Sequence, residues 1–344
     1  MKKFLTAFLS AMLLLSALFT FGCGKNGQDK NKLYLYVPDG APALSVARLL
    51  NDKGIVEDVN INVVSASTIQ TFVTGENPKA DFAIMPVNAA VKLLAGKEDY
   101  KLLGTVTNGN LFLMKQAGEQ DITKDNLSSL VGKKIGVMNI TNVPGLTFKA
   151  ILSDAGISYV DITETGIVQE DKVNLIALPA GQDGAKLIVP SSDCQYFVVA
   201  EPLATTKQNA TNGKISVAGS LQVLYGEGNG YPQAVLVAKT EVITNHKAVV
   251  DALINSFKDN KEWLTNQNTS AETIVNGVTS GFIDKDMAPT FTAKNLNATV
   301  INNCAINFTP AKDCMADVVT YIGKLNAISN NAWGIAKEEF FFIG

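Results

Sequence analysis

Short polar side chains follow several apolar runs of this 344-residue sequence, at the point where each run ends. Asp39, Gly40 and Ala41 come directly after LYLYV, and Pro86 and Asn88 come after DFAIM. A turn from a strand into a helix leaves the first backbone N–H groups of the helix unpaired, and these groups can donate to a polar or anionic ligand. We therefore expect both turns to contact a small molecule, although such turns also occur simply to connect a strand to a helix.

The same pattern recurs in the middle of the chain. Asn139 and Thr141 follow KKIGVM, where they either cap the next helix or reach a ligand. Glu201 follows QYFVVA and either accepts a hydrogen bond from a ligand or caps the following helix. Asn108 lies in an Asn-Gly turn, and Tyr231 either stacks on a flat ligand or fills the core of a hinge. All five residues are candidate ligand contacts.

Nothing in the sequence forms a catalytic set. The GxGxxG, GxxxxGK[ST], HExxH, CxxC and GxSxG motifs are all missing. His246 is the only histidine, and it precedes a helical pattern, so we expect it in solvent at the start of that helix. We predict a protein that is not an enzyme and that needs no cofactor and no metal.

The charge balance restricts the partners. Lys plus Arg number 29 against 32 Asp plus Glu, which gives a net charge of −3 and argues against nucleic acid. Arg48 is the only arginine, and its spacing places it on a solvated helix face. With no arginine in a candidate loop, an anion would depend on backbone N–H groups and hydroxyls, and a neutral heterocycle is at least as plausible.

The N-terminus has the layout of an export signal. Lys2 and Lys3 precede an uncharged stretch, residues 4–22, and Cys23 follows a small Gly22 as in the lipobox of bacterial lipoproteins. We predict a signal peptide at 1–22, a lipid (palmitate) attachment at Cys23, and a polar tether at 23–32. A retained membrane anchor and ordinary cleavage are the alternatives. The protein would then lie outside the cytoplasm, in the periplasm or on the outer face of the cell membrane.

Three further cysteines would share that oxidising compartment. Cys304 and Cys314 are ten residues apart around the loop-like INFTPAKD, and we predict a disulfide between them. Cys194 is left over as a buried thiol.

Apolar runs alternate with amphipathic stretches along the chain, which predicts an α/β protein with mixed, mostly parallel sheets flanked by helices. The pattern restarts once, so we expect two lobes with a ligand cleft between them. Lobe one would comprise 33–107 and 238–344, and lobe two 108–237. The expected strands are 33–37, 61–64, 81–85, 101–106, 133–138, 173–178, 195–200 and 233–239. The expected helices are 42–54, 67–75, 87–96, 141–156, 181–189, 246–267, 270–283 and 318–328.

Taken together, these segments resemble a known family. LYLYVPDGAPALSVARLL, ADFAIMPVNAAVKLL, VGKKIGVMNITNVPGLTFKAILSDAGI and FVVAEPLATT, in this order, are similar to the solute-binding lipoproteins of bacterial ABC importers. The nearest branch is the one that groups nitrate-, sulfonate-, taurine- and thiamine-pyrimidine-binding proteins. The resemblance implies a periplasmic binding protein fold of type 2, with the loops around Gly40, Pro86, Asn108, Asn139 and Glu201 facing the cleft.

The resemblance also implies a function. A monomer would capture a small molecule by lobe closure and deliver it to an ABC permease and its ATPase, while a lipid anchor holds it at the membrane. The expected ligand is a thiamine-pyrimidine-like heterocycle, a sulfonate or a related metabolite. The alternatives are an exported enzyme, and a sensor or adhesin that uses the same two-lobed fold without transport.

Overall fold

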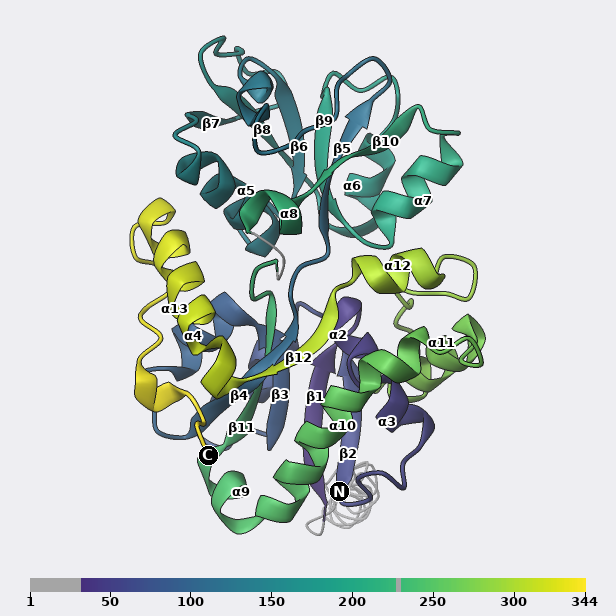
Figure 1. Ribbon diagram of the computed structural model, residues 1–344, viewed down its shortest axis with the longest axis vertical. Coiled ribbons are helices and arrows are strands. Elements are labelled where there is room, and N and C mark those ends of the chain that lie inside the picture. The colour runs from purple at the N-terminus through teal and green to yellow at the C-terminus, as the bar shows by residue number, and fades with distance from the viewer. Residues whose placement is uncertain (1–31, 227–229) are drawn as a thin grey trace, which may run out of the picture. The chain divides into compact units, whose positions relative to one another are not determined.

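The structure is a computed structural model that describes residues 32–226 and 230–344 (Figure 1). Residues 33–344 form one compact unit that contains two six-stranded sheets. The predicted signal peptide, Cys23 and nearly all of the predicted tether lie outside the described residues. Among the described helices, none has the length and apolar character that a membrane crossing requires.

The sheet of lobe one has the strand order β12-β4-β11-β3-β1-β2. β1 pairs in parallel with β2 and β3, whereas β11 runs antiparallel between β3 and β4. The sheet is therefore mixed, and its outermost strand next to β4 comes from the C-terminal part of the chain. Its strands are β1 (Leu33–Pro38), β2 (Val59–Val64), β3 (Phe82–Pro86), β4 (Tyr100–Thr107), β11 (Ala234–Lys239) and β12 (Ile306–Pro310).

The sheet of lobe two has the order β10-β5-β9-β6-β8-β7. Here β6, β7, β8 and β9 run parallel to one another, and β5 runs antiparallel between β9 and β10. The two sheets thus repeat one plan, a parallel block next to an antiparallel strand. The strands are β5 (Leu111–Gln116), β6 (Lys134–Met138), β7 (Tyr159–Ile162), β8 (Val173–Leu178), β9 (Tyr196–Ala200) and β10 (Ile215–Ser220).

Helices cover both faces of the lobe-one sheet because alternate side chains of its strands are apolar in both directions. Ala83 and Met85 of β3 pack with α4 (Val87–Leu94) and α13 (Ala311–Ile328), while Phe82 and Ile84 pack on the other face. That other face is covered by α2 (Ala41–Leu44), α3 (Ala47–Asn51), α10 (Lys247–Thr265), α11 (Ala271–Ser280) and α12 (Ala298–Asn303). A short helix, α9 (Thr240–Asn245), leads into α10.

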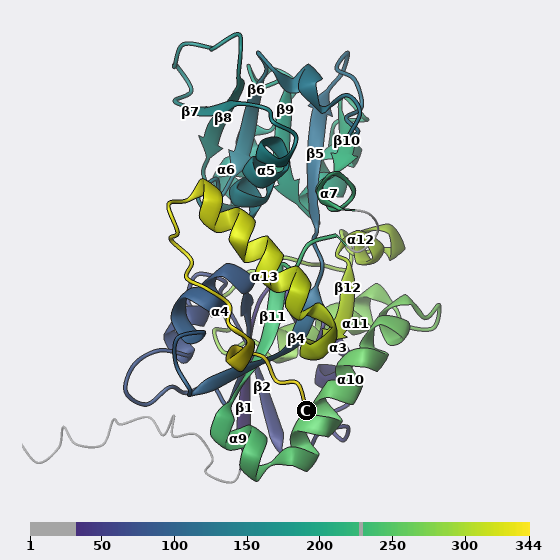
Figure 2. The ribbon, with the colours of Figure 1, turned by 60° about the vertical axis from the view of Figure 1, so that its left-hand side comes forward.

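In lobe two, α5 (Val143–Asp154) and α8 (Leu221–Tyr225) pack on one face, and α7 (Leu203–Ala210) packs on the other. α6 (Gly181–Leu187) follows β8. The core cluster beneath α5 is continuous with the one beneath α13, so the apolar core runs from one lobe into the other. Figure 2 shows α13 running from the neighbourhood of β12 towards α5.

The chain passes between the two sheets twice. The first crossing, 108–110, connects β4 to β5, and the second enters β11 at Ala234. Residues 108–110 and 230–233 are called the crossing segments below. Because β11 belongs to the lobe-one sheet from its first residue, the second crossing ends before position 238, where we expected the boundary.

The α/β, two-sheet fold class is confirmed, and so are the eight expected strands. Some local predictions are wrong. Residues 42–54 form two short helices separated by Ser45 and Val46, and 67–75 contains only the 3-10 turn η1 (Ile69–Phe72). Two other 3-10 turns are η2 (Leu127–Leu130) and η3 (Glu338–Phe340).

The predicted disulfide between Cys304 and Cys314 is not formed, since both thiols are free and buried. Residues of INFTPAKD that we expected in a loop form strand β12 and the start of α13. Cys304 at the end of α12 packs on one face of the sheet, and Cys314 on α13 packs on the opposite face. The sheet therefore separates the two sulfur atoms. The disulfide was predicted on the assumption that a flexible loop joins the two cysteines, and that assumption is wrong.

Candidate functional site

The turn after β1 is built around a glycine. Gly40 precedes α2 with φ 104°, a conformation that L side chains rarely adopt, and both Gly40 and Ala41 are buried. Asp39 is half-buried, and its Oδ2 accepts the backbone N–H of Thr290 at 2.7 Å. One of the two carboxylate oxygens thus holds the C-terminal part of the chain against this turn.

The turn after β3 places a buried amide beside the second crossing segment. Asn88 is 3% exposed in the first turn of α4, and its Oδ1 has no hydrogen-bond partner in the described chain. The N–H of Val87 donates to the backbone oxygen of Gln233, whose side-chain Nε2 donates to Asn110 Oδ1 at 2.7 Å. The Oε1 of Gln233 is also buried and unpartnered among the described residues.

These unpaired amide oxygens are the most informative feature of the strand ends. A buried polar atom without a partner costs about 1–3 kcal/mol, and such atoms mark places where a ligand or water completes the bonding. The unpartnered atoms of Asn88 and Gln233 are both carbonyl oxygens of side-chain amides, which accept hydrogen bonds. A ligand group with N–H or O–H donors would therefore satisfy them. Gln233 and Asn110 were not among the sequence candidates, although each lies two residues from a candidate, Tyr231 and Asn108.

The lobe-two candidates are placed differently. Asn139 follows β6 in the left-handed region, with φ 56°, and Asn139 and Thr141 are both exposed. Neither side chain caps α5, whose N-cap residue is Asn142. Both side chains are thus accessible at the end of β6 that precedes α5.

Glu201 is bonded within the protein. It is 3% exposed, and its Oε1 accepts from the Thr205 hydroxyl and from Asn303 Nδ2, each at 2.7 Å. Its Oε2 accepts the backbone N–H of Thr205 at 3.1 Å. Of the two roles considered for Glu201, the structure therefore shows the capping role at α7, together with a bond to α12 across the two lobes.

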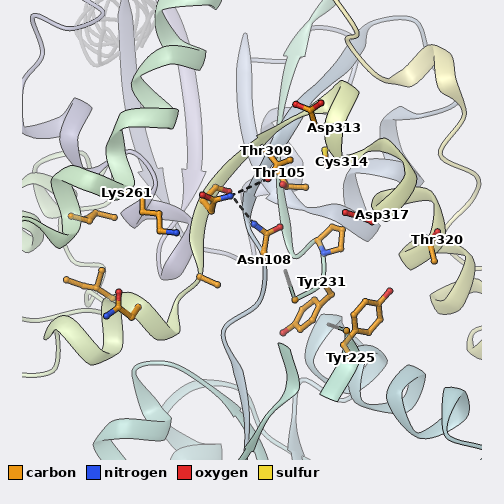
Figure 3. A pocket seen from close by; sticks show the side chains of 18 of the residues that line it. Thr105, Asn108, Tyr225, Tyr231, Lys261, Thr309, Asp313, Cys314, Asp317 and Thr320 are labelled. Atoms are coloured by element: carbon orange, nitrogen blue, oxygen red, sulfur yellow. Dashed lines mark hydrogen bonds between the residues drawn. The ribbon is translucent and has the colours of Figure 1, made fainter. Parts of the chain in front are cut away.

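A cavity with a volume of about 800 Å³ lies beside the crossing segments (Figure 3). Among the candidate ligand contacts, only Asn108 and Tyr231 line it. The remaining wall is formed by β12 and α13, by the facing ends of α10 and α12, and by Thr105 of β4 and Tyr225 of α8. The cavity therefore lies next to β12 and β4, whereas the predicted loops follow β1 and β3 on the other side of β11.

Tyr231 fills the core of the crossing segment and does not present its face to solvent. It is fully buried, stacks on Tyr321 with ring centroids 5.7 Å apart, and meets the edge of Tyr225. Burial raises the pKa values of the Tyr231 and Tyr321 hydroxyls well above the ordinary range, and it raises that of Tyr225 to about 12. These three rings are neutral packing elements at physiological pH.

The remaining reactive side chains lie apart from the strand ends. Arg48 pairs with Asp259 of α10 at 3.1 Å, and His246 is exposed between α9 and α10, where we expected it. Cys194 is buried beside Ser192, and desolvation raises the pKa of its thiol. In residues 32–226 and 230–344, no group of three or more His, Cys, Asp and Glu side chains could hold a metal ion.

Comparison with solved structures identifies the fold. A crystal structure of an ABC transporter from Parabacteroides distasonis aligns with a TM-score of 0.66 at 14% identity, covering 91% of this chain and 99% of that chain. A gene product of Candida albicans described as having the generic periplasmic binding protein structural fold aligns with a TM-score of 0.52 at 14% identity, over 87% and 90% of the two chains. The fold is that of a periplasmic binding protein.

Within this fold, solved neighbours include solute-binding proteins. The periplasmic aliphatic sulphonate-binding protein of Escherichia coli aligns with a TM-score of 0.63 at 11% identity, over 91% of this chain and 92% of that chain. At this identity the likeness establishes architecture and not ligand. No family model matches the sequence, and no curated protein matches it either.

Proposed function

We propose that this protein is the solute-binding component of an ABC importer and acts outside the cytoplasm. One observation carries the proposal: Asn88 after β3 and Gln233 in the adjacent crossing segment carry buried, unpartnered oxygens. In open α/β sheets, ligands bind beyond the carboxyl ends of the strands. The solved neighbours described as an ABC transporter and as a periplasmic aliphatic sulphonate-binding protein support the same role.

The proposed ligand is a small neutral heterocycle with N–H donors, such as a thiamine-pyrimidine-like compound. No candidate residue at the strand ends carries a positive charge, and Arg48 is paired with Asp259 elsewhere. A sulfonate would require donors, whereas the unpartnered atoms of Asn88 and Gln233 are acceptors. The neighbour from Escherichia coli is described as an aliphatic sulphonate-binding protein, so a sulfonate is the second candidate.

The decisive experiment is a thermal shift across a panel of aminopyrimidines and alkyl sulfonates. A bound compound at about a hundredfold above its Kd should stabilise the protein by roughly 2.7 kcal/mol. We expect aminopyrimidines to raise Tm and Asn88→Ala to abolish the rise, while Asn209→Ala on the exposed surface of α7 preserves it. If only sulfonates raise Tm, the ligand assignment is wrong but the transport role stands.

Lobe closure and the absence of turnover can be tested on the same sample. Ligand should reduce the radius of gyration measured by small-angle scattering, because a ligand that contacts both lobes favours their closed arrangement. A double variant, His246→Ala with Cys194→Ser, should bind normally if the protein is a receptor. Chemical conversion of the bound compound that this double variant abolishes would instead establish the exported enzyme.

Membrane attachment through Cys23 belongs to the same proposal. We expect radiolabelled fatty acid to enter the wild-type protein in cells, and Cys23→Ala to prevent labelling and release the protein from the membrane fraction. Copurification with a permease and its ATPase would support delivery. An unlabelled wild-type protein would refute the lipid anchor, and a sensor or adhesin role would gain support if ligand binding proceeds without uptake.

A further inference from the structure

The cavity of about 800 Å³ is separate from the proposed solute site. It lies on the β12 side of the crossing segments, whereas the unpartnered Asn88 lies after β3. Of the strand-end turns after β1, β3 and β6, none contributes a lining residue. Its volume falls within the range of roughly 300–1,000 Å³ that is typical of small-molecule sites.

Opposite charges line the two walls of this cavity. Figure 3 shows Lys261 of α10 on one side and Asp313 and Asp317 of α13 on the other. Asp313 and Asp317 are four residues apart, so they lie on one face of α13. None of these three side chains has an ion-pair partner in the described residues, although nine other ion pairs do form there.

Lys324 also lines the cavity, but its ammonium group already has an ion-pair partner. Its Nζ pairs with Asp154 of α5 at 2.5 Å and lies 4.7 Å from the ring centroid of Tyr225. The charges free to meet a ligand are therefore one cation on the α10 wall and two carboxylates on the α13 wall. A simple anion would face Asp313 and Asp317 unfavourably, and a simple cation would leave Lys261 without a partner.

A buried hydroxyl at the floor of the cavity is a second, independent indication of a ligand. Thr105 of β4 is 1% exposed, lines the cavity, and has an Oγ1 with no hydrogen-bond partner in the described chain. Its position beside Cys314 places it at the foot of the α13 wall (Figure 3). Such a hydroxyl can both donate to and accept from a polar group that enters the cavity.

We propose that this cavity is a second small-molecule site, which takes a zwitterion. Its ammonium group lies between Asp313 and Asp317, where it can also donate a hydrogen bond to the Thr105 hydroxyl, and its carboxylate pairs with Lys261. The site contacts both crossing segments through Asn108 and Tyr231, so its occupant would also affect the segments that connect the lobes. This proposal does not depend on the identity of the transported solute.

Calorimetric titration with a ladder of amino acids tests the site. The probes are glycine, β-alanine, γ-aminobutyrate and ε-aminocaproate, in which the ammonium and carboxylate groups are progressively further apart. We expect one length to bind best, because the two walls are at a fixed separation. Hexylamine and hexanoate, which carry only one of the two charges, should bind more weakly than that probe.

Variants assign the binding to the cavity. We expect Lys261→Gln and the pair Asp313→Asn with Asp317→Asn each to weaken binding of the best probe by up to about fivefold, the range for exposed ion pairs. Thr105→Val should weaken it further without a change in charge. Lys258→Gln, which removes an exposed lysine of α10 that does not line the cavity, is the matched control and should change nothing.

Asn88→Ala separates this proposal from the proposed function, because it should leave amino acid binding intact while it removes the solute-induced rise in Tm. The second site is refuted if no member of the ladder binds saturably at millimolar concentration. It is also refuted if hexylamine binds as tightly as the zwitterions, or if Lys258→Gln has the same effect as Lys261→Gln.

Discussion

A buried pair of hydroxyls joins α13 of lobe one to α5 of lobe two. The Tyr321 and Thr147 oxygens are 2.6 Å apart, and both residues are 0% exposed. Thr147 Oγ1 donates its hydrogen to the backbone oxygen of Val143 at 2.7 Å, so the Tyr321 hydroxyl must be the donor to Thr147. Tyr321 has no other hydrogen-bond acceptor among the described residues.

The two single substitutions should therefore have unequal effects. Tyr321→Phe removes the donor and leaves Thr147 bonded to Val143, so it should lower the free energy of unfolding by about 1 kcal/mol. Thr147→Val preserves the shape but leaves a buried tyrosine hydroxyl without an acceptor, which should cost about 2 kcal/mol. The double variant replaces both partners with apolar groups and should lose less than Thr147→Val alone.

Urea denaturation followed by circular dichroism and by tryptophan fluorescence measures these differences. Thr206→Val on the exposed side of α7 is the matched control, and it should stay within about 0.5 kcal/mol of wild type. A double variant whose loss equals the sum of the single losses, roughly 3 kcal/mol, would show that the hydroxyls do not interact. A larger effect of Tyr321→Phe than of Thr147→Val would reverse the assigned donor and acceptor.

Three further predictions concern buried polar groups. Glu201→Gln turns one acceptor into a donor next to Asn303, so it should cost about 1–2 kcal/mol in urea denaturation, and an unchanged midpoint would contradict the bonding described. The free thiols of Cys194, Cys304 and Cys314 should react slowly with iodoacetamide at pH 8 in the native protein and rapidly once it is unfolded. Burial raises the pKa of Cys314 to about 11 and raises the pKa values of the other two thiols above the ordinary value. Fast labelling of the native protein, or a mass that shows a disulfide, would overturn this prediction. Finally, Tyr225 has a folded pKa of about 12 against 10.0 for a free phenol, so its contribution to stability is complete below pH 10 and is lost as the pH rises towards 12. Urea midpoints measured from pH 8 to 11 in wild type and Tyr225→Phe should converge at high pH, and parallel curves would exclude this cause.

Most parallel strands of the two lobes were predictable because they are short apolar runs that end at turns, whereas β7 (YVDI), which has no buried residue, was not predicted. LYLYV, DFAIM and KKIGVM are buried from two sides by helices, which produces continuous apolar stretches that sequence analysis detects. β12 was not detected because INFTP is an edge strand with one mostly buried residue, Ile306. An edge strand needs neither an alternation of apolar and polar residues nor a long apolar run. Its sequence therefore resembles that of a loop.

The site was only partly predictable for a related reason. Turns after parallel strands can be located from the sequence, and the structure places Asn88 there as a buried amide. Gln233 and Asn110 lie in the crossing segments, where their bond depends on the pairing of β11 with β3 and β4. The cavity walls come from α10 and α13, which are distant in sequence and meet only because β12 joins the edge of the sheet.

Two helices from the C-terminal part of the chain, α12 and α13, form hydrogen bonds to lobe two that must break when the lobes separate. α12 bonds to lobe two through Asn303 and Glu201 on one face of the lobe-one sheet, and α13 bonds to it through Tyr321 and Thr147 on the other face. A rotation about the crossing segments that opens one side must therefore break one of these bonds, and a translation that separates the lobes breaks both. The Tyr321–Thr147 bond is buried and the Asn303–Glu201 bond is partly buried, and each contributes on the order of 1 kcal/mol to the arrangement described here. A solute then needs only a modest difference in affinity to make the closed arrangement dominant, which fits a receptor that must release its cargo after delivery.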